Sequence, residues 1–390
     1  MDPEKKGAYI KSISKKLDFG NIFIGLTVLL GILLVINLLL TSSLNKDLRK
    51  SAQELKEKLK PAKIEITSIK NSKCSDCFDI SAVLSYVKSS NVNATKEKTV
   101  EFDSKDGRDL IKKYGIKKIP ALVVTGEIEK VSIEGLEKNE DALLFTETSP
   151  PYTDALTGKI EGMVALYILK DSSCDKCNDL VQLISQIKAA GVKVSTEKKI
   201  EPSSDEGKEL IKKYSIGFAP AIILSKEAAA YDIMQEAWLQ IGTKEDDGSY
   251  VLRSVYPPYI NLTTGKLRGL VDLTYLVDKS CTPPLCYNVS VHREILTNPQ
   301  GVFTIKLEKE ETVDVEDAKG KELIAKYNIT QVPMVIISDE ASAYPSSQAL
   351  KQFFSIEKDG FYVFRRLQVL GTYRDLTTGQ IVKAQNEEQS

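Results

Sequence analysis

The first pattern along the chain is a long apolar run. Residues 22–40 read IFIGLTVLLGILLVINLLL and carry no charge, which is enough to cross a bilayer as one helix. We therefore predict a basic tail over residues 1–20 and a transmembrane helix over residues 21–41. A cleaved signal peptide is the alternative, but the run is longer than an ordinary signal core and is followed only by Thr-Ser-Ser.

The charges around this run suggest an orientation. Five lysines precede it, and a short basic tail is difficult to translocate, although basic residues also follow the run. We expect the N-terminus to be cytoplasmic and the rest of the chain to be extracytoplasmic. After the run, leucines keep a helical spacing up to Pro61, which predicts a helical stalk over residues 42–61.

Beyond Pro61 the chain repeats itself. The segments GRDLIKKYGIKKIPALVV, GKELIKKYSIGFAPAIIL and GKELIAKYNITQVPMVII begin at Gly107, Gly207 and Gly320. A second phrase ends each repeat and reads PPYTDALTGKIEG, PPYINLTTGKLRG or GTYRDLTTGQIVK. Units of this size are domains rather than solenoid repeats, and we place their boundaries at residues 62–158, 159–266 and 267–390.

The apolar pattern inside a module predicts its elements. A short apolar strand such as residues 64–69 or 164–169 is followed by an amphipathic helix and a second strand. Another helix then leads through a proline into a third strand, which starts ALVV in the first module. This order is typical of an α/β domain that begins as a βαβ unit and continues with further strands.

Composition narrows the possible chemistry. The formal net charge is −1, with basic and acidic residues interleaved, which argues against a nucleic-acid-binding surface. The single histidine, His292, disfavours Ser-His-Asp chemistry and histidine-based metal sites. We expect His292 to lie at the surface of the helix after the third cysteine pair. The chemistry of this chain must therefore come from cysteine, if there is any.

All six cysteines stand at the same place in their modules, between the first strand and the first helix. The pairs are Cys74 and Cys77 in CSDC, Cys174 and Cys177 in CDKC, and Cys281 and Cys286 in CTPPLC. A proline that starts the third strand follows each pair at a similar distance. These prolines, each with the residue before it, are Ile119-Pro120, Ala219-Pro220 and Val332-Pro333.

This combination of a Cys-x-x-Cys pair and a later proline before a strand resembles the thioredoxin-like superfamily. The resemblance covers nearly everything after Pro61, as three tandem thioredoxin-like domains with a central mixed sheet and helices on both faces. The whole arrangement also resembles archaeal membrane-anchored proteins with several thioredoxin domains. It implies a cis peptide bond before Pro120, Pro220 and Pro333, because a fold keeps so rare a bond for a geometric reason.

The resemblance also implies roles for the site residues. Each cysteine pair would head a helix, whose dipole would stabilise the thiolate of Cys74 or Cys174 as the nucleophile, with Cys77 or Cys177 as the resolving residue. The cis-proline loops, through the backbone of Ile119, Ala219 or Val332, would bind an extended substrate strand. No cofactor is implied.

The departures from the family pattern leave alternatives open. The Trp and Gly-Pro of thioredoxins are absent from both Cys-x-x-Cys sites, and the third pair is separated by four residues. We expect Cys281 and Cys286 to form a structural disulfide. A non-catalytic scaffold that binds partner proteins is the main alternative to an enzyme. A shared zinc site is disfavoured because the pairs belong to different domains.

We therefore expect a membrane-anchored thiol–disulfide oxidoreductase or isomerase that acts on extracytoplasmic proteins. Its partners would be substrate proteins with thiols or disulfides, an unknown redox partner and the lipid bilayer.

Overall fold

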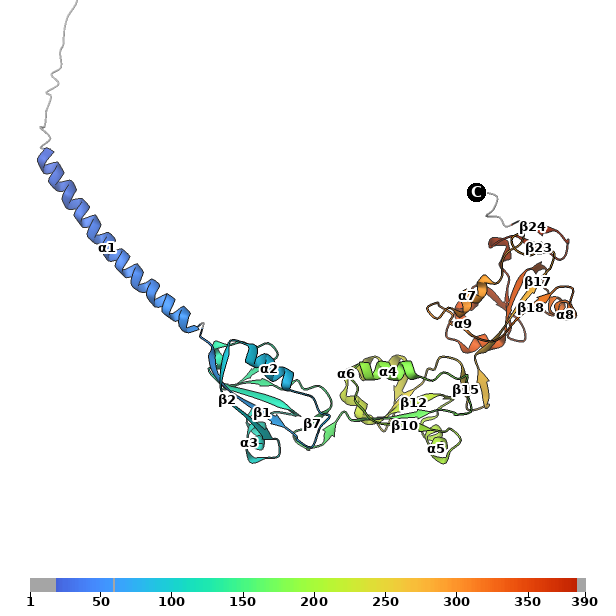
Figure 1. Ribbon diagram of the computed structural model, residues 1–390, viewed down its shortest axis with the longest axis horizontal. Coiled ribbons are helices and arrows are strands. Elements are labelled where there is room, and N and C mark those ends of the chain that lie inside the picture. Colours follow the sequence, from blue (N-terminus) through green and yellow to red (C-terminus); the bar gives the residue numbers. More distant parts are fainter. Residues whose placement is uncertain (1–18, 59, 384–390) are drawn as a thin grey trace, which may run out of the picture. The chain divides into compact units, whose positions relative to one another are not determined.

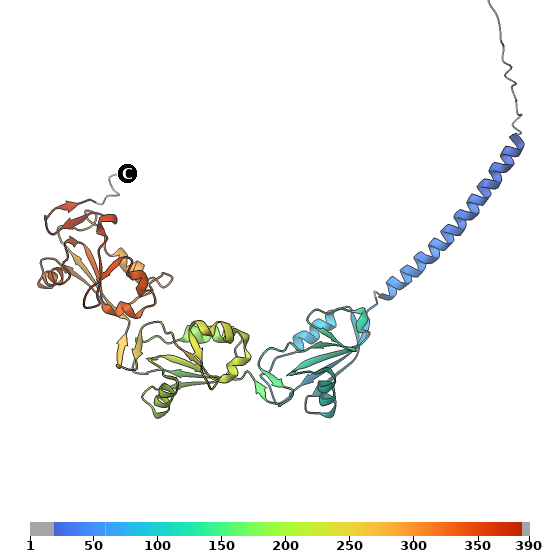
Figure 2. The same cartoon turned by 180° about the vertical axis from the view of Figure 1, so that it is seen from behind.

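The computed structural model describes residues 19–58 and 60–383 (Figures 1 and 2). One long helix, α1 (Phe19–Lys58), precedes the folded modules. It runs without a break through the predicted transmembrane segment and through the predicted stalk as far as Lys58. The division of this helix into a membrane segment and a stalk stays a prediction. Most of the predicted basic tail, residues 1–18, lies outside the described residues.

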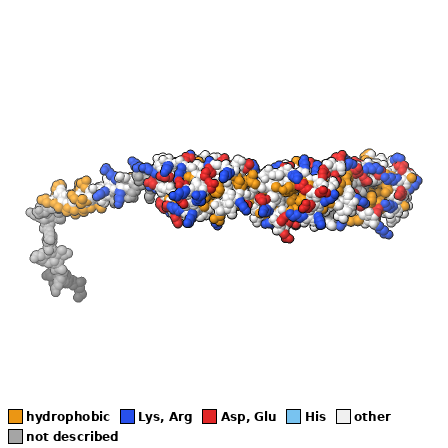
Figure 3. All heavy atoms as spheres, turned by 90° about the horizontal axis from the view of Figure 1, so that it is seen from below, with side chains coloured by type: hydrophobic (Ala, Val, Ile, Leu, Met, Phe, Trp, Pro, Cys, Tyr) orange, Lys and Arg blue, Asp and Glu red, His pale blue; other side chains and the backbone are white. Residues whose placement is uncertain are grey.

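Helix α1 is the one described helix that is long and apolar enough to cross a membrane, over Phe23–Gln53. Its apolar side chains are exposed, and Figure 3 shows them gathered along the helix, whereas acidic and basic side chains are interspersed over the modules. A signal sequence near an N-terminus meets the same criterion of length and composition. Membrane insertion and topology therefore stay predictions.

The three modules repeat one order of elements. The first contains β1 (Ala62–Lys70), α2 (Ser81–Ser89), β2 (Val92–Glu101), α3 (Lys105–Tyr114), β3 (Lys118–Ile119), β4 (Ala121–Gly126), η1 (Ile128–Lys130), β5 (Glu137–Asn139), β6 (Ala142–Phe145), β7 (Tyr152–Asp154) and β8 (Ile160–Glu161). The second contains β9 (Val164–Leu169), α4 (Val181–Ala189), β10 (Val194–Ile200), α5 (Asp205–Tyr214), β11 (Phe218–Ala219), β12 (Ala221–Leu224), η2 (Lys226–Ala230), α6 (Asp232–Glu236), η3 (Trp238–Gln240), β13 (Gly242–Lys244), β14 (Tyr250–Leu252), β15 (Tyr259–Asn261) and β16 (Lys266–Arg268). The third contains β17 (Leu270–Val277), α7 (Val291–Thr297), β18 (Lys306–Asp314), α8 (Ala318–Tyr327), β19 (Gln331–Val332), β20 (Met334–Ile337), η4 (Asp339–Ala343), α9 (Ser347–Leu350), β21 (Phe354–Ile356), β22 (Tyr362–Phe364), η5 (Leu367–Val369), β23 (Tyr373–Asp375) and β24 (Ile381–Val382).

Each module has a five-stranded sheet of the same topology. The orders are β2-β1-β4-β6-β5, β10-β9-β12-β14-β13 and β18-β17-β20-β22-β21. In the second and third modules the first two strands of the chain pair in parallel and the later strands are antiparallel, so these sheets are mixed. The predicted architecture of three mixed sheets with flanking helices after an apolar helix is confirmed, and it is the arrangement expected of three tandem thioredoxin-like domains. A separate three-stranded sheet accompanies each module: β3-β7-β8, β11-β15-β16 or β19-β23-β24.

The exact domain boundaries stay predictions. The chain divides into two compact units, one with the first five-stranded sheet and the other with residues 70–79, 101–120 and the part that follows residue 146. The hairpins β7–β8 and β15–β16 end at Glu161 and Arg268, slightly beyond the predicted ends at 158 and 266.

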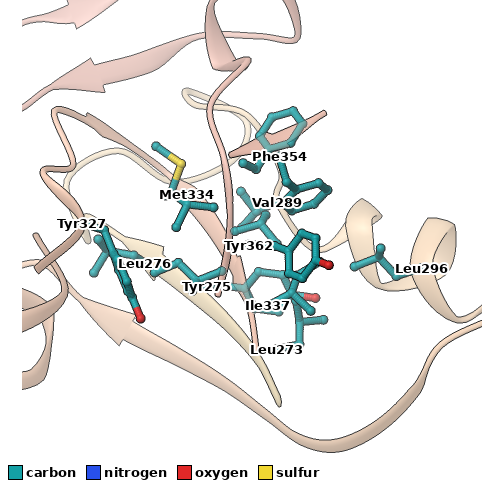
Figure 4. Packing of buried hydrophobic residues seen from close by; sticks show 14 of the residues in the cluster. Leu273, Tyr275, Leu276, Val289, Leu296, Tyr327, Met334, Ile337, Phe354 and Tyr362 are labelled. Carbon is teal, nitrogen blue, oxygen red and sulfur yellow. The ribbon is translucent and has the colours of Figure 1, made fainter. Parts of the chain in front are cut away.

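The period-two pattern of the strands gives each sheet two buried faces. In the second module Ile222 and Leu224 belong to one apolar cluster, whereas Ala221 and Ile223 belong to another. Adjacent residues of one strand point to opposite faces of a sheet, so helices can cover both. In the third module, Figure 4 shows Leu296 of α7 pointing from its helix toward the sheet residues.

The recurring glycine has a packing reason. A Cβ atom added to Gly107, Gly207 or Gly320 would lie 2.1, 2.1 or 2.0 Å from a backbone oxygen at the end of the preceding strand. The first turn of α3, α5 and α8 therefore rests directly on that strand end, which only glycine permits. The residues that supply these oxygens stand at the end of the strand or one position after it. They are Glu101, Glu201 and Asp314, and their side chains also reach the cysteine loops.

Candidate redox site

The six cysteines form three disulfides within their own modules, Cys74–Cys77, Cys174–Cys177 and Cys281–Cys286. They differ in exposure. The first two pairs are partly exposed, whereas Cys281 and Cys286 are only 2% and 5% exposed. A thiol in solution can therefore approach the sulfurs of the first two modules more easily than those of the third.

The cysteines do not head a helix, and this prediction was wrong. Helices α2 and α4 begin at Ser81 and Val181, beyond the intervening residues 78–80 and 178–180. The helix dipole acts only within the first turn, so it is not available to the sulfurs as expected. The physical reason is a competing hydrogen bond, because the amide after the second cysteine is held by another segment of its module.

That segment begins directly before the first strand of the closing hairpin, which is β7–β8, β15–β16 or β23–β24 in the three modules. The Phe78 amide donates to the Pro151 carbonyl at 2.8 Å, and the Asn178 amide donates to the Pro258 carbonyl at the same distance. In the third module the Tyr287 amide donates to Thr372, also at 2.8 Å. The hairpin and the cysteine loop are thus joined in the same way three times.

Two further contacts shape the loop before each first cysteine. The backbone carbonyls of Asn71, Asp171 and Asp278 accept from the Cys74, Cys174 and Cys281 amides at 3.1, 3.3 and 2.8 Å. Their side-chain oxygens accept from an amide two residues further along, an Asx turn. This fixes the chain direction as it enters the disulfide.

The second contact comes from the strand end that packs against the repeated glycine. The Glu101 carboxylate accepts from the Ser72 amide at 2.9 Å, and Glu201 accepts from the Ser172 amide at 3.1 Å. Asp314 accepts from the Lys279 amide at 3.1 Å. The side-chain and backbone hydrogen bonds from Ser72 hold the pKa of Glu101 below its usual value. One residue thus links the helix start, the strand end and the cysteine loop.

The predicted cis prolines are confirmed. The bonds Ile119-Pro120, Ala219-Pro220 and Val332-Pro333 are all cis. Three more cis bonds, Pro150-Pro151, Pro257-Pro258 and Pro283-Pro284, were not predicted. They lie within the paired prolines at the start of two closing phrases and within the third cysteine loop, and a proline pair alone does not specify its isomer.

The residue before each cis proline already has a strand partner. Ile119 pairs with Thr153, Ala219 with Ile260 and Val332 with Arg374, all antiparallel.

This pairing brings the hairpin to the sulfurs in the first module. The Thr153 hydroxyl oxygen lies 3.8 Å from Cys77 Sγ and accepts a 2.9 Å hydrogen bond from Asn71 Nδ2. Because the disulfide sulfur has no hydrogen, Thr153 is the only possible donor in the contact with Cys77.

In the third module, an ion pair holds the closing hairpin to the cysteine loop. The Arg374 guanidinium donates to the Asp278 carboxylate at 2.6 Å and also bonds the Ser280 hydroxyl. Burial opposes the ionisation of Asp278, but hydrogen bonds from Ser280 and the charge of Arg374 outweigh it and hold its pKa below the usual value. This ion pair ties the hairpin to the loop that carries Cys281.

His292 is buried, contrary to the prediction of a surface residue. It is 5% exposed, its ring lies 4.7 Å from that of Phe364, and its Nε2 is 3.3 Å from the Tyr287 hydroxyl. Burial lowers its pKa to about 4. The helix that carries it packs into the core of the module, and the sequence pattern did not show which face of that helix would point inward.

Sequence reasoning missed the loop supports. An Asn or Asp stands three residues before each first cysteine, and an acidic residue stands six residues before each repeated glycine. These recurrences were the available signals for the Asx turns and the carboxylate contacts.

Comparison with known proteins gives only distant likenesses. No family model and no curated protein matches the chain. Among solved structures, the N-terminal domain of alkylhydroperoxide reductase AhpF from Enterococcus faecalis is 16% identical and matches 46% of this chain and 89% of its own, with a TM-score of 0.15. Human ERp44 is 12% identical over 76% of this chain and 84% of its own, with a TM-score of 0.14. ERdj5 is 12% identical over 78% of this chain and 38% of its own, with a TM-score of 0.15. Such values make no case for a shared activity.

Proposed function

We propose that the first two modules exchange disulfides with protein thiols through Cys74–Cys77 and Cys174–Cys177, and that Cys281–Cys286 is structural. The observation that carries this proposal is the difference in exposure between the pairs. Thiol–disulfide exchange needs access of a thiolate along the S–S axis, and only the two Cys-x-x-Cys pairs are partly exposed.

The reaction is a pair of displacements at sulfur. A thiolate of the client attacks Sγ of Cys74, the intramolecular S–S bond breaks, and Cys77 leaves as a thiolate. A second client thiolate then attacks the client sulfur of the mixed disulfide and releases Cys74. The client loses two electrons and two protons to form its disulfide, and the module becomes a dithiol. The reverse steps reduce or isomerise a client.

Thr153 supports the first displacement in the first module. Asn71 donates to its oxygen, which leaves the hydroxyl hydrogen directed to Cys77. A hydrogen bond to a thiolate stabilises the charged form, so Thr153 would favour Cys77 as the leaving group. The second module has Ile260 at this register position and lacks the donor. The two pairs should therefore differ in reactivity.

A graded redox titration of the purified full-length protein tests the proposal. The protein is equilibrated with reduced and oxidised dithiothreitol, free thiols are alkylated, and each pair is scored by peptide mass. We expect Cys74–Cys77 and Cys174–Cys177 to be reduced at a lower ratio of reduced to oxidised dithiothreitol than Cys281–Cys286. The serine variants of Cys77 and Cys177 should trap mixed disulfides with a client, whereas serine at Cys286 should not. If the third pair opens first, the assignment of the active modules is wrong.

The location of the protein is part of the proposal. Helix α1 would anchor the chain in a lipid bilayer, with the modules outside the cytoplasm, where disulfides persist. The partners would be client proteins with thiols or disulfides and a second redox protein that resets the modules. Resistance of the protein to carbonate extraction, together with protease digestion of the modules from the outside of intact cells, would support this. Release by carbonate would contradict it.

A scaffold without catalysis remains the second candidate, and one observation favours it. On the side of the hairpin, the backbone edge beside each cis proline is already paired within the module, so a client cannot pair with the strand on that side. A chain in which none of the three pairs exchanges with a protein thiol would be a scaffold with three structural disulfides.

A further inference from the structure

In each module, the short strand before the cis proline is paired with a strand from the closing hairpin of the same module. Strands β3, β11 and β19 end at the residue before the cis proline, and their hydrogen-bonded neighbours are β7, β15 and β23. The pairing continues into the turn. The amides of Ala155, Leu262 and Leu376 donate to the carbonyls of Lys117, Gly217 and Thr330 at 2.8, 2.9 and 2.8 Å. The arrangement recurs three times.

The same hairpin is attached to the cysteine loop on its other side. The amide after the second cysteine donates to the residue at which the hairpin segment begins, as with Phe78 and Pro151. In the first module Thr153, which pairs with Ile119, also contacts Cys77. The hairpin therefore bridges the cis-proline loop and the sulfurs.

An extended polypeptide that is to bind by backbone pairing needs an unpaired strand edge. On the side of the cis-proline strand that faces the cysteine loop, this edge is held by the hairpin. A small thiol needs no strand edge to attack a sulfur. An extended polypeptide thiol therefore needs the position that β7 occupies, whereas a small thiol does not.

The hairpin is built to open more easily than the core. Strands β7 and β8 have three and two residues, and the tip residue Leu156 is 87% exposed. The pairing of β7 with β3 covers only two residues of each strand, so the hairpin can open locally while the domain stays folded. The third hairpin differs, because the ion pair of Arg374 with Asp278 fastens it to the cysteine loop.

We infer that the closing hairpin of each module is an intramolecular occupant of the client-binding edge and must leave it before an extended thiol polypeptide can pair beside the disulfide. This inference rests on the proposed function and adds an autoinhibitory step to it. The first and second modules would open for clients, and the third would stay closed. The partner is an extended polypeptide that carries a thiol or a disulfide.

Ala155→Pro in the full-length protein opens the first hairpin selectively. It removes the amide that donates to Lys117, at a turn position that proline accepts, after the extended residue Asp154. The matched control is Leu156→Ala, which changes an exposed side chain in the same turn and keeps its amide. The second module of the same molecule is an internal control.

Two dithiols serve as probes, dithiothreitol and the unstructured peptide GSTCVTSCTVSG. Their rate constants for reducing Cys74–Cys77 are measured by alkylation and mass spectrometry. Loss of one hydrogen bond should raise the ratio of peptide rate to dithiothreitol rate about fivefold in Ala155→Pro. The ratio should stay constant in Leu156→Ala and at Cys174–Cys177. An equal ratio in wild type and Ala155→Pro would overturn the inference.

A second measurement separates this inference from the proposed function. If the peptide dithiol reduces no pair in any variant, the proposed exchange activity fails. Binding of the same peptide with both cysteines replaced by serine is then followed by fluorescence anisotropy. Tighter binding to Ala155→Pro than to the wild type supports the occupied edge, and equal binding overturns it. Should the proline variant unfold, hydrogen exchange in the wild type decides. The Phe78 and Ala155 amides should be protected, but less than the core strands, and exchange at the rate of an unstructured peptide would overturn the inference.

Discussion

The buried histidine of the third module makes its stability sensitive to mild acid. The pKa of His292 is lowered by burial from 6.5 to about 4, whereas in the unfolded chain it returns to the ordinary value. Between these values the unfolded state binds a proton that the folded state does not. The free energy of unfolding of this module therefore falls as the pH drops through 6.5, and the loss is complete below about pH 4.

The magnitude follows from the two pKa values. A pKa difference of one unit corresponds to about 1.4 kcal/mol, so the full difference corresponds to about 3 kcal/mol. Between pH 7 and pH 5 the linkage relation gives a loss of about 2 kcal/mol. Most carboxylates stay ionised over this interval, so protonation of His292 should dominate the change in the free energy of unfolding.

The chain offers a clean assay because His292 is its only histidine. Its Hε1 ring proton gives one NMR signal, which should titrate with a midpoint near 4 in the folded protein. Native-state hydrogen exchange of strand β20 at pH 7 and pH 5, corrected for intrinsic rates, gives the change in opening free energy. In His292→Leu this pH dependence should disappear, whatever the variant does to absolute stability.

Two results would refute the reasoning. An NMR midpoint near 6.5 would mean that the ring is solvated. A pH dependence of β20 that persists in His292→Leu would mean that another group is responsible. The first and second modules contain no histidine and should show no comparable loss between pH 7 and pH 5.

Two further predictions concern the repeated packing and the hairpin turns. In Gly207→Ala the new Cβ would lie 2.1 Å from the Glu201 carbonyl oxygen, so overpacking of about 1–3 kcal/mol should exceed the helix-propensity gain of up to about 1 kcal/mol. Hydrogen exchange of the second module should report this loss of stability. The control is Gly217→Ala, which has open space around it and should cause no such loss. Equal behaviour of the two variants would contradict the packing argument. The amides of Thr157 and Leu156 help hold the pKa of Asp154 below its usual 3.8. The hairpin turn at Asp154 should therefore lose stability as the pH falls through that lowered pKa. In the second module, Asn261 makes equivalent turn contacts and does not titrate. The ratio of protection of the Ala155 amide to that of Leu262 should therefore fall in acid, and a constant ratio would count against the turn carboxylate.

The sequence was sufficient for the repeated architecture and for the places of the cysteine pairs and prolines within each module. The apolar pattern predicted the α/β modules, and the resemblance to the thioredoxin-like superfamily implied three cis bonds, all of which the structure contains. Local chemistry explains this success, because apolar periodicity and proline act over a few residues. The cis bonds within the paired prolines were missed because a proline pair alone does not specify its isomer.

What the sequence could not determine depends on contacts between distant segments. The cysteine turn ends before its helix because the Phe78 amide is taken by Pro151, a residue more than seventy positions away. Thr153 reaches Cys77, and Arg374 reaches Asp278, only after the closing hairpin folds back.

By itself, then, the sequence determined three modules of one kind, each with a cysteine pair and a cis-proline loop. Only the tertiary structure decided that the edge of that loop is paired, that the third disulfide is buried and that the histidine lies in the core. The physical reason is that strand pairing and burial depend on which surfaces meet. That is a property of the folded chain, and no short stretch of residues contains it.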